Sequence, residues 1–236
     1  MKDIKSWGID KVPRWEEFKS FFQLKFVIYL ITWFTLIPII VNLLSKAPKE
    51  LKLTFAKPEL IIPMSLPFSW EIMWFSSLSF FIAYILYILA IPKFVRKYNN
   101  YKDYEKYGHS PRNLVYQAVD IANTEKFIER MCEKNFITTI DTIPDDDNNP
   151  SVTKEQTIYY WQFQDYKYKF GMPILNPSNV TESEKEIFWE IFGRFSEKRL
   201  PVRILISILL ILSLLLFGYV LIHHIQSGYA YAMENI

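Results

Sequence analysis

Apolar and polar residues alternate in long blocks along this chain of 236 residues. Three apolar blocks, residues 26–44, 72–92 and 204–222, contain no Asp, Glu, Lys or Arg. A helix rises about 1.5 Å per residue, so each block is long enough to cross a hydrocarbon layer about 30 Å thick. Lipid offers the backbone no hydrogen bonds, so a segment that crosses it has to satisfy its own amides. The pattern therefore predicts an α-helical integral membrane protein with three transmembrane helices, the third over 203–224.

The block between the second and third predicted spans, 93–202, carries acidic and basic residues in similar numbers and has the pattern of a soluble domain. Gly108 favours the end of one helix, and Ser110 before a proline favours the start of the next. Thr181 and Glu184 have the spacing of a capping box. They predict a last helix that begins at Thr181 and runs towards the third span.

Two β segments are predicted within this block. Residues 136–143 are rich in Ile and Thr, and residues 157–170 are rich in Tyr, Trp and Phe. An acidic turn with Asn and Pro separates them at 145–150. We therefore expect a small α+β domain, without internal repeats, inserted between the second and third spans.

Basic residues beside the spans predict the orientation of the chain. Lys198, Arg199 and Arg203 precede or open the third span, whereas no Lys or Arg follows Ile222. This contrast predicts that the soluble domain is cytoplasmic and that the tail, 225–236, is periplasmic.

The two remaining segments follow from that orientation. Residues 1–25 are expected in the cytoplasm, where aromatic residues at helical spacing predict an amphipathic helix on the membrane surface. The proline-rich loop 45–71 is expected in the periplasm, although its four lysines oppose the charge rule. Abundant Phe, Ile, Lys and Asn with little Gly are compatible with an A+T-rich bacterial gene. The expected location is the bacterial inner membrane.

Candidate chemistry in the soluble segments is sparse. Asp145, Asp147 and Asn149 imitate the alternating oxygens of a calcium loop, but Pro150 stands where Gly is needed and Gln156 where a bidentate Glu is needed. We therefore expect no metal ion, no cofactor and no enzymatic activity.

Three further features bear on function classes. His109 has no second ligand at metal-site spacing, which favours a surface role. The lone Cys132 has no adjacent base, which favours packing over reactivity. The chain has neither a strongly basic face nor a Gly-rich phosphate loop, so nucleic acid is not an expected partner.

Five residues are candidates for partner binding. In the second span, Ser76 and Ser79 allow close helix contact, either with a partner or within the protein's own spans. In the aromatic segment, Tyr159, Trp161 and Phe163 share one face of a strand, and the other face is expected to carry a second aromatic set. Core packing and partner binding remain alternatives for these rings. The members of the second set are Tyr160, Tyr166 and Tyr168.

Residues 67–118, with the run from Tyr107 through Gly108, His109, Ser110 and Pro111 to Arg112, resemble three-pass inner-membrane immunity proteins. Such proteins protect bacteria against pore-forming, colicin-like toxins of type VI secretion systems. The resemblance implies a protein that meets the toxin's helices in or near the lipid bilayer and stops the pore from opening. A protein partner, namely the toxin, is therefore expected.

A second hypothesis comes from a different functional class. A membrane effector or sensor of an anti-phage defence system would bind a signal with its cytoplasmic domain and perturb the membrane through oligomerised spans. A homo-oligomer is compatible with either hypothesis. The absence of Asp, Glu, Lys and Arg from the apolar blocks 26–44, 72–92 and 204–222 disfavours conduction by a monomer.

Overall fold

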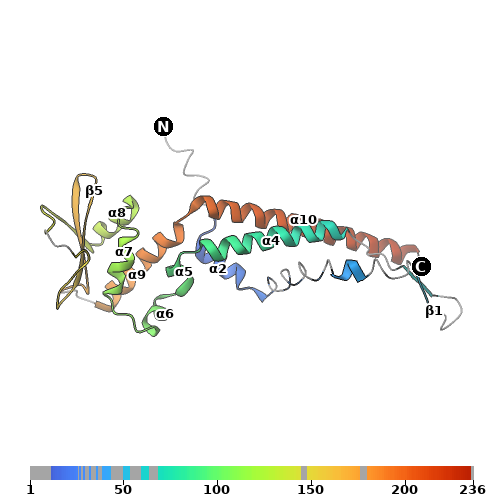
Figure 1. Ribbon diagram of the computed structural model, residues 1–236, viewed down its shortest axis with the longest axis horizontal. Helices are drawn as coiled ribbons and strands as arrows, with labels where there is room; N and C mark the ends of the chain where they lie inside the picture. Colours follow the sequence, from blue (N-terminus) through green and yellow to red (C-terminus); the bar gives the residue numbers. More distant parts are fainter. Residues whose placement is uncertain are drawn as a thin grey trace. The chain divides into compact units, whose positions relative to one another are not determined.

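The computed structural model describes residues 12–25, 27, 29, 32, 36, 39–43, 50–53, 60–63, 69–144, 148–175 and 180–234 (Figure 1). The chain divides into two compact units. The helical unit comprises Met1–Pro13, Glu17–Ala90 and Arg199–Ile236. The α+β unit comprises Arg14–Glu16 and Ile91–Lys198.

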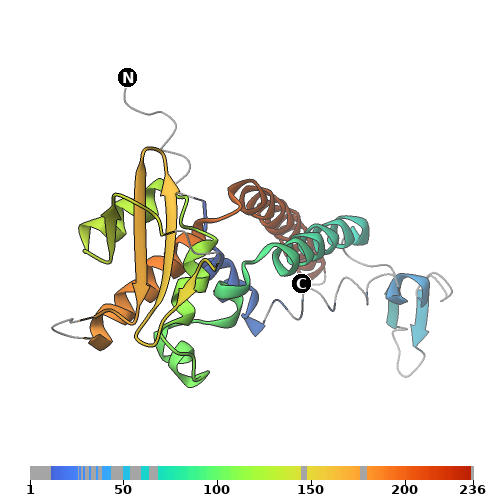
Figure 2. The same cartoon turned by 60° about the vertical axis from the view of Figure 1, so that its left-hand side comes forward.

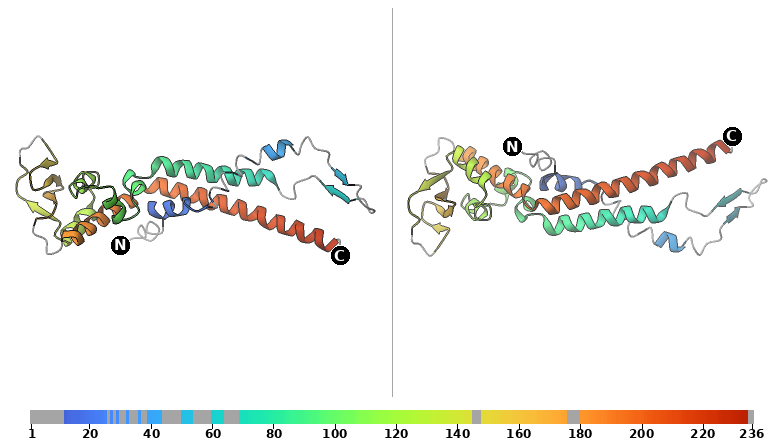
Figure 3. Two further views of the ribbon diagram at one scale, coloured as in Figure 1. Left: turned by 90° about the horizontal axis from the view of Figure 1, so that it is seen from below. Right: turned by 90° about the horizontal axis from the view of Figure 1, so that it is seen from above.

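Two long helices dominate the helical unit. Helix α4 covers Trp70–Ala90, with 21 residues, and helix α10 covers Leu200–Glu234, with 35 residues. They lie side by side in both views of Figure 3. Within the described residues, these two helices are long and apolar enough to span a membrane. Helix α10 is about 52 Å long at the usual helical rise, so it continues well past the predicted end of the third span.

The first predicted span, 26–44, lies largely outside the described residues. Its described positions are all helical: Val27, Tyr29, Thr32, Leu36 and 39–43. Val41 packs against the buried pair Met73 and Val220, which belong to α4 and α10. Two helices of spanning length are therefore observed, whereas three are not shown.

A short N-terminal helix, α2, covers Trp15–Phe22. Its aromatic side chains Phe18 and Phe22 are buried. The Phe22 ring lies 5.8 Å from the Phe80 ring and 4.6 Å from the Tyr87 ring, measured between centroids. The aromatic face that predicted a helix on the membrane surface is thus covered by α4 instead, because these rings find aromatic partners there.

The predicted periplasmic loop, 45–71, contains a short antiparallel strand pair that the sequence pattern did not predict. Strand β1 covers Glu50–Leu53 and strand β2 covers Leu60–Pro63. Glu50 pairs with Pro63 and Leu53 pairs with Leu60. Pro63 is tolerated because it ends a strand in a two-stranded sheet, where every strand is an edge.

The α+β unit contains five helices and a four-stranded sheet within the described residues. The helices are α5 (Lys93–Lys97), α6 (Tyr101–Lys106), α7 (Asn113–Val119), α8 (Glu125–Glu133) and α9 (Val180–Glu197). The strands are β3 (Ile137–Ile140), β4 (Ser151–Val152), β5 (Thr157–Phe163) and β6 (Tyr166–Met172). The sheet is antiparallel in the order β3-β6-β5-β4.

Helices cover one face of this sheet. α7 contacts β5 and β6, and α8 contacts β3. In Figure 1 the sheet is seen close to its edge, and α7, α8 and α9 lie on the same side of it. Figure 2 shows the strands more openly, with the long β5 and β6 at the centre. The unit is therefore a two-layer α+β arrangement.

Helix α9 organises the core of the α+β unit. Its buried side chains recur at helical spacing and form one apolar stripe. α5, α6, α7 and α8 all contact this helix. The Phe188 ring lies 5.4 Å from Phe94 and 5.5 Å from Tyr104, so aromatic packing joins α9 to the start of the unit. The buried stripe comprises Ile187, Phe188, Ile191, Phe192 and Phe195.

Two details of the helix boundaries bear on the sequence predictions. Gly108 has φ of 65°, and its amide donates to the Glu105 carbonyl at 2.9 Å, so it terminates α6 as predicted. Helix α9 begins at Val180, one residue before the predicted cap Thr181. Glu184 accepts a hydrogen bond from the Tyr101 hydroxyl at 3.2 Å, so tertiary packing uses the carboxylate that was assigned to the capping box.

Candidate functional site

Helices α4 and α10 pack as an antiparallel pair, which we call the hairpin although the α+β unit separates the two helices in the chain. The Arg199 guanidinium donates to the Ala90 carbonyl at 2.8 Å, at the C-terminal end of α4. Fourteen residues earlier on α4, the Ser76 hydroxyl donates to the Ser213 carbonyl at 2.8 Å. Residue numbers therefore fall along one helix as they rise along the other. The Arg199 cation also suits its position, because helix C-termini carry partial negative charge.

The small polar residues of the hairpin lie inside it. Ser76, Ser77 and Ser213 are buried, and the two hydroxyl oxygens of Ser76 and Ser213 lie 3.5 Å apart. Ser77 Oγ has no hydrogen-bond partner among the described residues. Ser76 therefore serves packing between the protein's own helices, whereas Ser79 is half-exposed.

Large apolar side chains lie on the outside of both helices. On α4, Phe75, Ile82 and Leu89 repeat every seven residues and are all exposed, Leu89 by 74%. The α10 stripe repeats at intervals of three, four and seven residues. A protein in water rarely exposes so much contiguous apolar surface, whereas a surface of this kind fits lipid or a partner helix. The exposed α10 stripe comprises Ile204, Ile208, Ile211, Leu215 and Ile222.

The aromatic segment forms a hairpin rather than the single strand that was predicted. The chain reverses between Phe163 and Tyr166, and Gln164 takes a left-handed conformation with φ of 53°. Trp161 pairs with Tyr168, and Phe163 pairs with Tyr166. Paired residues share a face, so the prediction that Tyr166 and Tyr168 lie opposite Trp161 is wrong. Because of the turn, side chains at even positions of β6 share a face with side chains at odd positions of β5.

This shared face belongs to the core of the α+β unit. Trp161 and Tyr168 are buried, with their rings 5.5 Å apart and nearly parallel. The Tyr159 ring stacks on Trp161 at 5.2 Å. Tyr159 and Phe163 are half-buried. The Trp161 indole nitrogen has no hydrogen-bond partner among the described residues. Of the three candidate rings, Tyr159 and Phe163 retain accessible surface for a partner.

The opposite face of the sheet is mainly polar. Tyr160 lies there, opposite Lys169 on β6. Asn149 bonds to both backbone groups of Tyr160: its side-chain oxygen accepts from the Tyr160 amide at 3.0 Å, and its amide group donates to the Tyr160 carbonyl. Asn149 thus extends the sheet edge beside the short strand β4. The other members of the calcium-like run, Asp145 and Asp147, lie outside the described residues.

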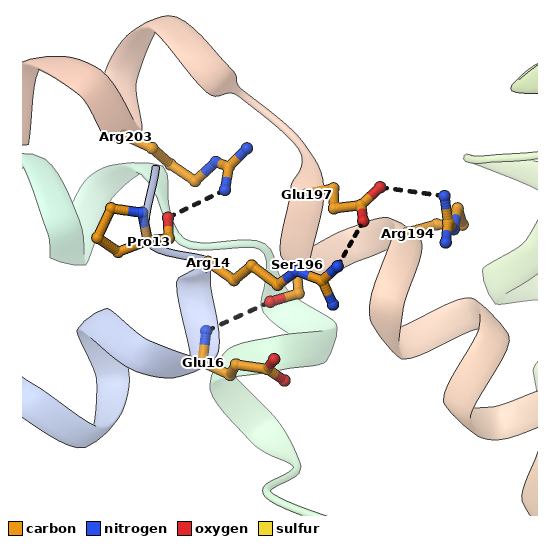
Figure 4. Close-up of polar contacts among 7 residues, drawn as sticks. All are labelled: Pro13, Arg14, Glu16, Arg194, Ser196, Glu197 and Arg203. Carbon is orange, nitrogen blue, oxygen red and sulfur yellow. Dashed lines mark hydrogen bonds and ion pairs between the residues drawn. The ribbon is translucent and has the colours of Figure 1, made fainter. Parts of the chain in front are cut away.

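Polar contacts anchor the N-terminal segment to the end of α9 (Figure 4). The Arg14 guanidinium lies 3.0 Å from Glu197 Oε1, and Arg194 lies 3.0 Å from the second oxygen of the same carboxylate. The Glu16 amide donates to Ser196 Oγ at 3.3 Å. The fully buried Trp15 donates through its indole nitrogen to the Lys198 carbonyl at 2.8 Å.

Arg203 also anchors the N-terminal segment, within the helical unit. Its guanidinium donates to the Pro13 carbonyl at 3.0 Å, and the side chain is 4% exposed (Figure 4). The sequence suggested only a topological role for this residue. Its structural role was missed because Pro13 lies 190 positions away in the chain. No local spacing pattern reports such a contact.

Burial raises the pKa of several titratable groups in the α+β unit. Burial raises the pKa of Tyr101 to about 12, and its hydroxyl bonds to Glu184. Burial, opposed by this hydrogen bond and reinforced by the charge of Glu105, raises the pKa of Glu184. Burial also raises the pKa of Cys132, which disfavours the nucleophilic thiolate form. Among the described residues, no group of three His, Cys, Asp or Glu side chains is placed to hold a metal ion.

The described residues thus form a pair of apolar helices long enough to span a membrane and a small α+β unit. Comparisons with protein families, with curated proteins and with solved structures found no match for the chain.

Proposed function

We propose that this protein is an immunity protein of the bacterial inner membrane, which binds a pore-forming toxin and neutralises it. In this proposal α4 and α10 cross the membrane, and their exposed apolar stripes receive the helices of the toxin. The α+β unit is cytoplasmic, the C-terminus is periplasmic, and the first apolar block supplies a third span.

The construction of the hairpin carries this proposal. Its apolar stretches, 72–92 and 204–222, contain no Asp, Glu, Lys, Arg or His, and the Ser76 hydroxyl is bonded inward to Ser213. Ion pathways and proton relays in membranes ordinarily need ionisable groups. A hairpin with an apolar exterior and inward-facing serines is suited to dock helices without conducting ions itself.

The proposed topology is supported by basic residues at both ends of the long α+β segment. Lys93, Arg96 and Lys97 follow α4, and Lys198 and Arg199 precede α10. Because the two helices are antiparallel, these ends lie on one side of a membrane that both helices cross. Basic residues that flank spans favour the cytoplasmic side.

The test is protection of a sensitive bacterium against the cognate toxin, identified by co-purification from native membranes. Three alanine substitutions on the α10 stripe, Ile208→Ala, Ile211→Ala and Leu215→Ala, remove bulk from the exterior and leave the helix apolar enough to insert. The triple variant is expected to reach the membrane at normal abundance and to lose protection.

The matched control keeps the side-chain volume: Ile208→Leu, Ile211→Leu and Leu215→Ile together should still protect, because volume-conserving exchanges are well tolerated. Full protection by the alanine variant would refute docking on this stripe. Depolarisation of the host on overexpression of the wild type would instead favour the membrane effector of an anti-phage system.

A further inference from the structure

A polar cleft of about 350 Å³ lies beside α5 and α6 in the α+β unit. None of the interactions described above uses it. It combines two cations, an amide, a carboxylate and an aromatic ring on one small surface. The lining residues are Lys97, Asn99, Asp103, Lys106 and Tyr107.

Aromatic neighbours hold the Lys97 ammonium in place. Lys97 Nζ lies 3.0 Å from His109 Nε2 and 4.5 Å from the centre of the Tyr107 ring. It also lies 5.3 Å from the centre of the Tyr98 ring. Burial and the charge of Lys97 lower the pKa of His109, which favours the neutral imidazole, and an unprotonated Nε2 accepts a hydrogen bond from the ammonium. The lysine is thus positioned before any ligand arrives.

The cations of the cleft are not neutralised by carboxylates. The ion pairs found among the described residues involve neither Lys97 nor Lys106. Asp103 also lines the cleft; its carboxylate accepts a hydrogen bond from the Asn99 amide at 3.2 Å and forms none of these ion pairs with the two lysines. Two ammonium groups with a neighbouring amide and phenol make a donor set that suits a phosphate group.

The position of Lys97 in the chain limits how far this residue can lie from the end of α4. Lys97 follows Ala90, the last residue of α4, by seven residues, so they are at most about 25 Å apart even in an extended chain. Residues Lys93–Lys97 are helical, which shortens this distance further. Basic pockets next to spans on the cytoplasmic side bind anionic lipid headgroups. This step rests on the proposed membrane location of α4.

We infer that the cleft binds a phosphate group through Lys97 and Lys106, either in the headgroup of an anionic phospholipid or in a soluble phosphorylated molecule. The two sources share the same recognition chemistry. They differ in where the remainder of the ligand lies, in the bilayer or in solution.

The experiment compares the full-length wild type with the variant Lys97→Ala/Lys106→Ala, both purified in detergent. One arm measures binding to anionic phosphatidylglycerol, with zwitterionic phosphatidylcholine, which has no net charge, as the reference, by native mass spectrometry. A second arm measures binding of inorganic phosphate and glycerol phosphate by calorimetry. In at least one arm, removal of both lysines should weaken binding about thirtyfold, since each cation near an anionic surface contributes about 1 kcal/mol and about 1.4 kcal/mol corresponds to a factor of ten.

The charge-matched control is Lys126→Ala/Lys154→Ala, which removes two exposed lysines from other parts of the α+β unit. It should bind like the wild type, and Lys97→Arg/Lys106→Arg should retain binding. Dependence on the two lysines in the lipid arm identifies a headgroup, and dependence in the second arm alone identifies a soluble ligand. Equal binding by the wild type and the double alanine variant in both arms would overturn the inference. Toxin protection is not measured here, so failure of the immunity proposal would be seen separately.

Discussion

At the scale of single residues, Ser76 shows how one side chain can satisfy two interpretations of a sequence. A small polar residue in a predicted span suits either a partner's helix or a neighbouring helix of the same chain. Its burial and its 2.8 Å bond to the Ser213 carbonyl assign it to the contact between α4 and α10. Ser79, only three positions along, is half-exposed and makes the natural comparison.

Replacing Ser76 with Ala should lower the free energy of unfolding by about 0.5–1 kcal/mol, the usual size of a hydrogen bond between membrane helices. The measurement is unfolding of the full-length protein in mixed micelles by titration with dodecyl sulfate. Ser79→Ala should change stability by less than Ser76→Ala. Equal effects of the two substitutions would contradict the assigned role of the Ser76 hydroxyl.

At the scale of elements, apolar blocks were easier to predict than chain reversals. The helices α4 and α10 follow from uninterrupted apolar composition, and the end of α6 follows from Gly108. The turn between β5 and β6 contains Gln164 and Asp165, without the Asn-Gly or Asp-Gly pair that usually marks a tight hairpin. The sequence therefore suggested one long strand and gave the wrong face for two tyrosines.

The buried side of this hairpin should dominate its stability. Trp161→Ala is expected to destabilise the protein by about 3–5 kcal/mol, because a large ring leaves a cavity in a packed core. Tyr160→Ala, on the opposite face, should cost much less. Thermal unfolding followed by circular dichroism measures both. A small loss for Trp161→Ala would mean that its ring is available to a partner rather than needed by the core.

At the scale of the whole molecule, contacts between distant parts of the sequence were beyond prediction. The α+β character followed from the alternation of helical and aromatic segments. The contact of Trp15 with Lys198 joins positions 183 residues apart, and no spacing rule reports it. The candidate partner residues also separate in the structure, with Ser76 and Ser79 in the helical unit and the rings on β5 in the α+β unit.

The proposed topology predicts the outcome of reporter fusions. Alkaline phosphatase folds to its active form outside the cytoplasm, because it needs disulfides. Fused after Ile236 it should be active, and fused after Asn148 it should be inactive. The opposite pattern would place the α+β unit in the periplasm and would remove the basis for the proposed orientation.

The length of α10 has a geometric consequence for a chain with this topology. To keep a helix of about 52 Å inside a hydrocarbon layer of about 30 Å would require a tilt of about 55°, beyond the range of about 0–40° seen for membrane helices. In the proposed topology the last turns, which carry His223, His224 and Tyr229, would therefore extend into the periplasm as a continuous helix. A toxin that approaches from outside the cell would meet this helix before it reaches the bilayer.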